Sequence, residues 1–410
     1  MHWQLAAYLA LNRLLSPAAP AILRRRLAKG REDPARWREK LGYPGLERPP
    51  GRLIWMHAVG LGEVMALRGL IAALPADLAV LVTSSALSSA QVAAGQLAPN
   101  ARHQFLPLDT PGPVARFLSH WRPSLAVWAE QDLWPRAVVA ADRAGVPLAM
   151  VNARMGAAAH ARRDRAAGLY GELLRRFALI AAQDEGTAAN LRALGADGVR
   201  VTGPMKAAAP PLGCDEGELA RLRELLAGRR VWLAGPTHPG DEAVALAAQA
   251  RLGPPATLIL APRYPERGVA VAAAAAASGL TVAFRSRGEA PPAAGGVWLA
   301  DTFGEMGLWY RLADAALVGG GFDAGGHNPW EAAALGAAIL HGPETFNFMT
   351  DYKSLHGDLA ARPVSGPEDL LAALSDPALP AMATRAQAIA ARLAAGTQAL
   401  AADLIALARP

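Results

Sequence analysis

The stretch ADAALVGGGFDAGGHNPWEAAALGAAIL, residues 313–340, joins two apolar elements through a glycine-rich turn. Residues 313–318 are a short apolar run typical of a buried strand, and residues 331–340 predict a helix followed by another strand. The turn Gly319–Glu331 therefore lies where a strand passes into a helix. Backbone N–H groups at such a turn can approach an anion closely, and a helix N-terminus favours negative charge. The stretch predicts an α/β fold with a phosphate-binding turn.

The same alternation of apolar strands and helices continues along the chain from Arg52 onward. Such alternation predicts a parallel sheet that is covered by helices on both faces. We expect strands near residues 53–59, 78–85, 103–109, 125–130, 147–154, 178–184, 200–206, 230–238, 256–263, 280–286, 297–301 and 315–321, and helices that include 60–74, a segment from about Ser88, 113–120 and a segment from about Pro380.

A segment rich in proline and small residues, 207–218, interrupts this pattern and divides the chain into two α/β halves. Ligands of open α/β sheets bind outside the carboxyl ends of the strands, so two such domains predict a site in the cleft between them. The predicted divisions are an N-terminal apolar and basic segment at 1–30, a Rossmann-like domain at 31–205, a linker at 206–228, a second Rossmann-like domain at 229–385 and a C-terminal helix at 386–410 that packs back on the first domain.

Composition excludes several classes of protein. Of the 410 residues 52% are hydrophobic and 19% are charged, which indicates an ordered globular protein. Cys214 is the only cysteine, so the chain has neither a disulfide framework nor a thiolate metal site. The glycine-rich turn lacks the G-K-[ST] of a Walker loop and the G-x-G-x-x-G of a dinucleotide fingerprint.

The positive charge of the chain is concentrated at its beginning. Residues 1–44 hold nine lysines and arginines against three acidic residues, and this excess equals the +6 of the whole protein. Trp3, Tyr8 and Leu9 followed by Arg24–Arg26 fit a helix in the membrane interface on the cytoplasmic side. An ordinary amphipathic helix packed on its domain is the alternative. The apolar run is too short to span a bilayer, which takes about 20 residues, and nucleic acid is disfavoured because stacking aromatics are missing.

Polar residues gather at the predicted strand ends of the first half. In HAVGLGE, residues 57–63, Glu63 is a candidate general base, although a first-turn helix charge would look the same. Gly60 and Gly62 would let a substrate hydroxyl approach the backbone. Glu130, in EQDLWP, could hold sugar hydroxyls or brace a loop. The motif Asn152–Arg154 could bind phosphates of an acceptor or belong to a solvated basic face.

The second half has anion-binding candidates at its strand ends. PTHPGDE, residues 236–242, forms a strand–turn–helix, and Arg263 in APRYPER suits a phosphate oxygen. A helix N-terminus with a carboxylate in its opening turns suits a nucleotide-sugar, with amides for phosphate and Glu331 for ribose hydroxyls. The donor-binding candidates are Arg263, Gly319, Gly320, Gly321, Gly325, Gly326, His327, Asn328 and Glu331.

Taken together and in order, these motifs resemble the 3-deoxy-D-manno-octulosonic acid (Kdo) transferases of lipopolysaccharide synthesis. The family pattern has H-A-V-S-x-G-E, E-T-E-L-W-P, N-A-R, S-T-H-x-G-E-E, P-R-H-x-E-R and G-G-S…G-G-H-N-x-x-E followed by G-P…N-F. This chain matches nearly all of it from about Arg31 to Phe348. The departures are Gly60 and Pro236 for serines, Gln131-Asp132 for Thr-Glu, Gly156-Ala157-Ala158-Ala159 for a Ser/Arg-rich segment, and Gly321 for serine.

The resemblance implies a B-type glycosyltransferase fold with two Rossmann-like domains and an active site in the interdomain cleft. It implies inverting transfer of Kdo from CMP-Kdo to a hydroxyl of a lipid A precursor, with no cofactor and no essential metal. Glu63 would be the general base, Glu130 would orient the substrate or the base, and the first domain would bind the acceptor. Arg263 and Gly319–Gly321 would hold the CMP phosphate. The basic N-terminus would keep the enzyme, as a peripheral protein, at the cytoplasmic face of the inner membrane.

Three alternatives stay open at this point. The chain could be a Kdo transferase paralogue with another acceptor, or a B-type glycosyltransferase that uses another nucleotide-sugar. It could also be a non-catalytic protein that binds sugar nucleotides or lipids, but the retention of Glu63 and Glu331 argues against this.

Overall fold

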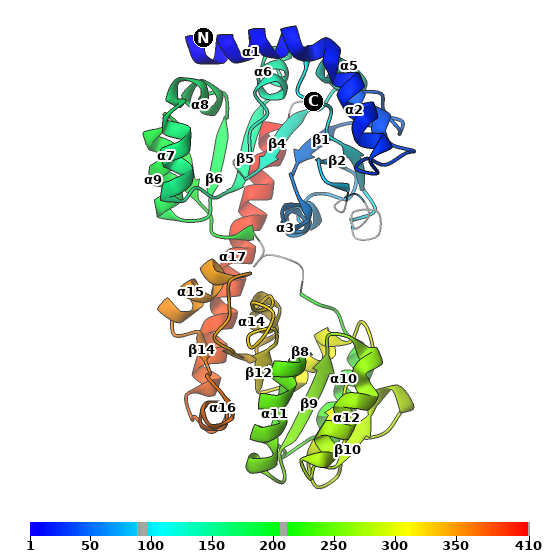
Figure 1. Ribbon diagram of the computed structural model, residues 1–410. Coiled ribbons are helices and arrows are strands. Elements are labelled where there is room, and N and C mark those ends of the chain that lie inside the picture. The colour runs from blue at the N-terminus through cyan, green and yellow to red at the C-terminus, as the bar shows by residue number, and fades with distance from the viewer. Residues whose placement is uncertain (88–89, 91–96, 131, 206–210, 409–410) are drawn as a thin grey trace. The chain divides into compact units, whose positions relative to one another are not determined.

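The computed structural model describes residues 1–87, 90, 97–130, 132–205 and 211–408, with only the backbone of Leu61. It divides into two compact units (Figure 1). Unit 1 comprises Met1–Pro210 and Leu393–Pro410, and unit 2 comprises Pro211–Arg392. The helix predicted from about Ser88 falls largely outside the described residues, as does Gln131.

Unit 1 is built on a parallel sheet of seven strands in the order β3-β2-β1-β4-β5-β6-β7. Apolar side chains that alternate along the strands reach two separate cores: Trp55 and Trp128 lie in one, and Ile54 and Met56 lie in the other. The sheet is therefore buried on both faces, as the continuous apolar runs predict. Its strands are β1 Leu53–His57, β2 Ala79–Ser84, β3 Ala101–Phe105, β4 Leu125–Ala129, β5 Leu148–Ala153, β6 Leu179–Ala182 and β7 Val199–Val201.

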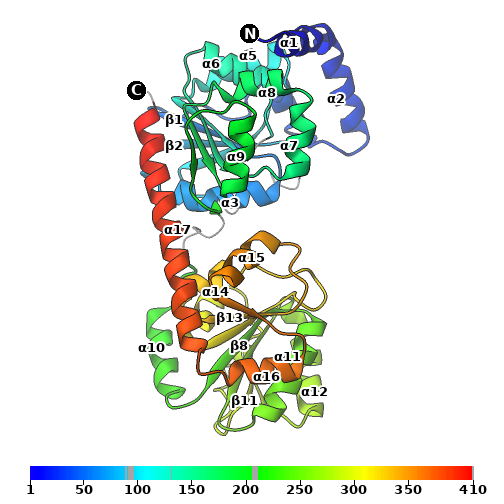
Figure 2. The same cartoon turned by 90° about the vertical axis from the view of Figure 1, so that its left-hand side faces the viewer.

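Helices cover both faces of this sheet (Figures 1 and 2). Trp55, from the inner strand β1, packs on Phe117 of α5 with 4.8 Å between ring centroids. The helices described in unit 1 are α1 Trp3–Leu15, α2 Ala19–Ala28, α3 Leu61–Ala72, α5 Pro111–Trp121, α6 Pro135–Arg143, α7 Ala157–Asp164, α8 Ala167–Leu174 and α9 Glu185–Ala193, with 3-10 turns at Ser16–Ala18 and Trp37–Leu41.

Unit 2 has a second parallel sheet of seven strands, in the order β10-β11-β9-β8-β12-β13-β14. Its strands are β8 Val231–Thr237, β9 Thr257–Pro262, β10 Val282–Phe284, β11 Gly296–Leu299, β12 Ala315–Val318, β13 Ala338–His341 and β14 Ala361–Pro363. Its helices are α10 Glu216–Leu225, α11 Pro239–Leu252, α12 Gly268–Ala277, α13 Met306–Leu312, α14 Trp330–Leu335, α15 Met349–Gly357 and α16 Pro367–Leu374, with 3-10 turns at Pro265–Arg267 and Arg285–Arg287.

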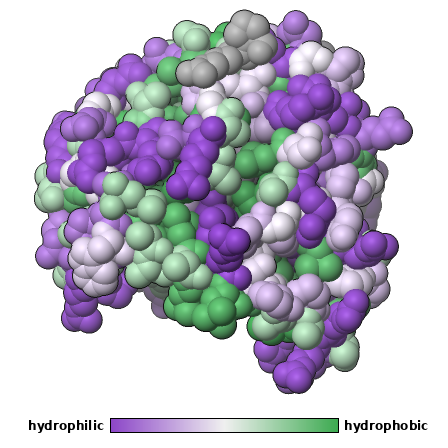
Figure 3. All heavy atoms as spheres, turned by 90° about the horizontal axis from the view of Figure 1, so that it is seen from above, coloured by the Kyte–Doolittle hydropathy of each residue, from purple (hydrophilic) through white to green (hydrophobic). Residues whose placement is uncertain are grey.

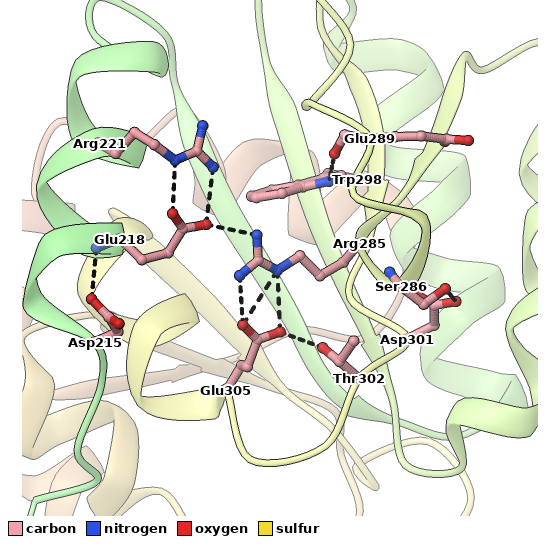
Figure 4. A network of polar contacts seen from close by, with 10 residues as sticks. All are labelled: Asp215, Glu218, Arg221, Arg285, Ser286, Glu289, Trp298, Asp301, Thr302 and Glu305. Atoms are coloured by element: carbon pink, nitrogen blue, oxygen red, sulfur yellow. Dashed lines mark hydrogen bonds and ion pairs between the residues drawn. The ribbon is translucent and has the colours of Figure 1, made fainter.

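The predicted linker at 206–228 is wrong in its second half, because α10 forms there and belongs to unit 2. Asp215 caps this helix by accepting a hydrogen bond from the Glu218 amide, and Leu219 and Leu222 are buried one turn apart. Figure 4 shows how charged side chains fix it: Arg285 bonds Glu218 of α10 at 2.7 Å and also pairs with Glu305. The prediction of a linker did not take account of the amphipathic spacing of these leucines, which indicates a helix.

The long helix α17, Leu379–Leu407, begins where a helix was predicted, near Pro380 and before the predicted domain boundary at 386, and it contributes to a hydrophobic core in each unit. Met382 and Ala383 belong to the core of unit 2, whereas Leu400 and Leu404 belong to a core of unit 1. Its length and apolar composition would also suit a membrane span, but a third of its most apolar window (33%) is buried inside the protein. Burial in the two cores accounts for its apolar face.

The N-terminal segment packs on unit 1 by one face and exposes apolar side chains on the other. Leu5, Leu9 and Leu23 are buried. Figure 3 views the molecule from the side on which α1 lies, and hydrophobic areas alternate there with hydrophilic ones. The large apolar side chains exposed in this segment are those of Met1, Trp3, Leu11, Leu14, Leu15 and Ile22.

Candidate active site

Each sheet has a topological switch point, where successive connections leave in opposite directions along the sheet. In unit 1 this point lies between β1 and β4, and in unit 2 it lies between β8 and β12. The loops after these strands carry the predicted site residues: Glu63 follows β1, Glu130 follows β4, and Gly319 follows β12. Ligand sites of open α/β sheets form at such points, so each unit brings its predicted residues to the expected edge.

In unit 1, Glu63 lies in the first turn of α3, and its carboxylate folds back on the turn before it. Its Oε2 accepts a hydrogen bond of 2.9 Å from the Gly60 amide, which is the one half of a capping box that a glycine at the N-cap allows. A Cβ at Gly60 would approach this oxygen at 2.9 Å, and Gly62 has open space around its Cα. The carboxylate is therefore held at a partly open turn, where it can also accept a proton.

A buried histidine, His57, stabilises the end of the strand from which this turn starts. His57, the last residue of β1, is fully buried, and burial lowers its pKa to about 4, so the ring is neutral. Trp134 Nε1 can only donate, so His57 Nε2 accepts its hydrogen bond at 2.9 Å. His57 Nδ1 therefore carries the proton and donates to the Thr83 carbonyl at 3.1 Å. This chain of bonds fixes the end of β1 on which the Glu63 turn rests.

Glu130 directly follows β4, and Asn152 is the last residue but one of the neighbouring strand β5. Both have left-handed backbones, with φ of 63° and 54°. Such conformations cost non-glycine residues on the order of 1 kcal/mol or more and cluster at functional sites. The Glu130 amide donates to the Val151 carbonyl at 2.9 Å, which links the two positions. Asn152 is buried and its Oδ1 accepts from the Met205 amide, whereas Arg154 is exposed. The Asn152 side chain thus holds the protein's own backbone in place, and Glu130 and Arg154 are the candidates for ligand contact.

In unit 2, the glycines of the turn allow close packing of backbone on backbone. A Cβ at Gly319 would overlap the Pro236 carbonyl, and a Cβ at Gly321 would come within 2.5 Å of the Gly342 amide nitrogen. As predicted, the turn leads into a helix, α14, which begins at Trp330. The glycines therefore bring the end of β8 and the loops after β12 and β13 together.

Asp241 joins two of these loops. Its Oδ2 accepts hydrogen bonds from the His238 amide at 2.9 Å and from the Gly320 amide at 2.7 Å. The residue is fully buried, and this burial raises its pKa. The Gly320 amide is thus used within the protein. Asp241 was not among the predicted site residues, although the motif PTHPGDE contains it.

Three basic side chains, those of His238, His327 and Arg263, lie in the loops after β8, β12 and β9. His238 and His327 approach each other with 3.2 Å between their Nε2 atoms. Burial, followed by the neighbouring His238 and Arg263, lowers the pKa of His327 to about 4. Arg263 follows β9, is exposed, and is anchored by its amide on the Thr237 carbonyl at 2.9 Å. One exposed cation beside two imidazoles suits a phosphate or carboxylate ligand.

The remaining donor-side residues complete the loop. Asn328 Oδ1 accepts from the Trp330 amide at 3.2 Å and its Nδ2 lies 3.4 Å from Glu331 Oε1. Gly325 and Gly326 are braced by Asn347, whose Nδ2 donates to the Gly326 carbonyl at 3.3 Å. Among the described residues, no group of three or more His, Cys, Asp or Glu side chains is arranged to hold a metal ion.

Fold and site geometry together define a class of protein. Two Rossmann-like units with polar groups at their switch points are typical of B-type glycosyltransferases. The structure of MurG from Acinetobacter baumannii agrees, with a TM-score of 0.54, 16% identity, and coverage of 87% of this chain and 100% of that one. This likeness shows the fold.

Sequence relatives narrow the class to one family. Residues 35–209 match the family described as 3-deoxy-D-manno-octulosonic-acid transferase (kdotransferase). A probable 3-deoxy-D-manno-octulosonic acid transferase, mitochondrial, from Arabidopsis thaliana is 35% identical, over 85% of this chain and 81% of its own. The 3-deoxy-D-manno-octulosonic acid transferase of Bordetella pertussis is 36% identical, over 72% of each chain. The chain belongs to the Kdo transferase family and is a glycosyltransferase.

Proposed function

We propose that this protein transfers Kdo from CMP-Kdo to a hydroxyl of a lipid A precursor in lipopolysaccharide biosynthesis. Membership of the Kdo transferase family carries the proposal. The separate placement of an anion-binding cluster in unit 2 and a carboxylate turn in unit 1 fits a donor and an acceptor of different chemistry. CMP-Kdo supplies a phosphate and a sugar carboxylate, and the acceptor supplies a nucleophilic hydroxyl.

In the proposed reaction Glu63 takes the proton of the acceptor hydroxyl while the oxygen attacks the anomeric carbon of Kdo. The bond from that carbon to the phosphate oxygen of CMP breaks on the opposite face, so the configuration inverts. Arg263 offsets the negative charge that grows on the departing phosphate, and we propose that no essential metal ion is needed. His327, whose pKa burial lowers to about 4, stays uncharged near pH 7 and would donate a hydrogen bond to the same anion.

The experiment is incubation of the full chain with CMP-Kdo and a lipid A precursor, followed by mass spectrometry of the lipid. We expect the mass of one or more added Kdo residues. A paralogue with another acceptor would bind CMP in calorimetry without modifying this lipid. Tighter binding of UDP or GDP than of CMP would overturn the choice of donor.

We further propose that the protein is peripheral at the cytoplasmic face of the inner membrane. The exposed apolar side chains of the N-terminal segment support this, among them Trp3 and Leu14 at 69% and 75% exposure. Residues 1–31 also hold six basic residues and no acidic one. An apolar face bordered by cations is what an anionic lipid surface attracts.

A further inference from the structure

A cavity of about 350 Å³ lies in unit 1 beneath helix α2. Ala19, Ile22 and Leu23 of that helix form one wall, and Leu106–Leu108, the segment after β3, form another. Most of these walls are apolar, and the volume is within the range of small-molecule sites. Among its lining residues, Ile22 is 56% exposed, so the cavity continues onto the apolar face of the N-terminal segment.

One end of this cavity is charged. Arg26, Glu32 and Lys40 line it, and Glu32 pairs with both cations at 2.5 Å. Glu32 and Lys40 are buried, and the pairs lower the pKa of Glu32 against the effect of burial. Glu32 therefore stays ionised and leaves this trio with one net positive charge. The exposed arginines of α2 add to it, so an amphiphile with an anionic head is the ligand that this end favours.

The cavity also adjoins the turn that carries Glu63. Trp134 lines the cavity and donates to His57, the last residue of β1. Ser85 lines it as well, and its amide bonds the Val59 carbonyl at 3.2 Å. A ligand whose apolar part fills the cavity would therefore have its polar part close to the candidate base.

We propose that this cavity receives an acyl chain of the phosphorylated lipid acceptor. The chain packs between Ile22 and Leu106, a phosphate lies near Arg26 and the other cations of α2, and the acceptor hydroxyl reaches the Glu63 turn. This assignment rests on the proposed function for its choice of lipid. It gives the enzyme a hold on the acceptor that is separate from contact with the bilayer surface.

The test uses dodecyl phosphate with a diazirine in its chain, photolysed with the full-length protein. We expect mass spectrometry to locate the attachment on α2 and on residues 106–108, and we expect the lipid A precursor to suppress it. Attachment confined to exposed residues of α1, such as Leu11 and Leu14, would overturn the proposal. Suppression by a bulk phospholipid but not by the lipid A precursor would overturn the choice of occupant.

Two matched variants separate the cavity from the surrounding apolar face. Ile22→Glu and Leu14→Glu each place a carboxylate at an exposed apolar position, but only Ile22 lines the cavity. We expect Ile22→Glu to reduce cavity labelling and to raise the KM for the lipid acceptor about tenfold, because a carboxylate against an acyl chain is poorly solvated. Leu14→Glu should leave cavity labelling within about twofold, because Leu14 belongs to the proposed membrane-facing surface and does not line the cavity. Equal effects of the two variants on cavity labelling would overturn the proposal.

These readouts also separate the two proposals. Cavity labelling that the lipid A precursor suppresses, in a protein that transfers no Kdo, would reject the proposed reaction and keep the lipid site. Kdo transfer with a normal KM in Ile22→Glu would reject the lipid site and keep the reaction.

Discussion

Glu63 has two tasks that a single substitution can separate. Its Oε2 accepts the Gly60 amide, so the carboxylate both caps α3 and is the candidate base. Glu63→Gln keeps an oxygen for the cap but removes the basicity. We expect kcat for Kdo transfer to fall by about 10²–10⁴, which is the usual contribution of a general base.

The measurement for Glu63→Gln is single-turnover transfer, with the affinity for CMP as the control. CMP binding should stay unchanged, because Glu63 belongs to unit 1 and the donor candidates belong to unit 2. Unchanged transfer in this variant would show that another group removes the proton.

Asp241 is buried with its carboxylate between two backbone amides. Asp241→Ala would remove the oxygen that accepts both amides and leave two donors without an acceptor, at a cost of about 1–3 kcal/mol. We expect CMP to bind about tenfold more weakly and the melting temperature to fall. Asp323→Ala is the control, since that side chain is exposed and accepts the Gly240 amide at the same edge. Equal CMP affinity in both variants would contradict the role of Asp241.

The element α10 depends on a charged network that titrates. Hydrogen bonds from Arg221, followed by those from Arg285, lower the pKa of Glu218 to about 2. An acid with a depressed pKa stabilises the fold above its unfolded pKa of about 4.3, and this stability is lost as the pH falls toward 2.

We therefore expect the melting temperature to fall between about pH 4.5 and 2, and Glu218→Gln to reduce that fall by about 2–4 °C. Differential scanning calorimetry across this range checks it. Glu216→Gln is the matched control, because it removes a carboxylate from the same first turn without the pair to Arg285. The same pH dependence in both variants would contradict the role of Glu218.

Binding of α1 and α2 to an anionic surface should weaken as the salt concentration rises. Arg24 and Arg25 are exposed on α2, and each such cation contributes about 1 kcal/mol near an anionic membrane. We expect the double alanine variant to bind phosphatidylglycerol vesicles at least about tenfold more weakly in cosedimentation at low salt. Arg223→Ala with Arg392→Ala removes the same charge from exposed sites of unit 2 and should bind normally.

Apolar runs predicted both sheets, because fully buried parallel strands carry that pattern on both faces. Glu63, Glu130 and Gly319 were placed at the correct edge for the same reason: loops after parallel strands share one edge. Asp241 could not be predicted, since its bond to Gly320 joins residues 79 positions apart. The cavity beneath α2 was equally hidden, because it needs Ile22 and Leu106 to be near in space.

At the scale of the whole molecule, the helix α17 supplies buried leucines to unit 1 from the far end of the chain. Leu404→Ala should destabilise unit 1 by about 2–5 kcal/mol, the usual cost of such a core truncation. Arg392→Ala, at an exposed position of the same helix, should cost less than about 0.5 kcal/mol. Urea unfolding followed by near-UV circular dichroism measures both. A cost below 1 kcal/mol for Leu404→Ala would show that this part of α17 is not needed for the core.

The contribution of α17 to the core of unit 1 has a consequence for synthesis on the ribosome. The strands of unit 1 emerge first, yet Leu400 and Leu404 emerge only after all of unit 2. Ile54, Val80 and Val127 share the core that these leucines complete. Apolar surface on that side of the first sheet therefore stays exposed until the leucines have been synthesised. Unit 2 needs only the first turns of the same helix, which hold Met382 and Ala383, and these residues emerge shortly before Leu400. We therefore expect unit 2 to reach its final packing first, and a chaperone that captures nascent chains to hold unit 1 longest.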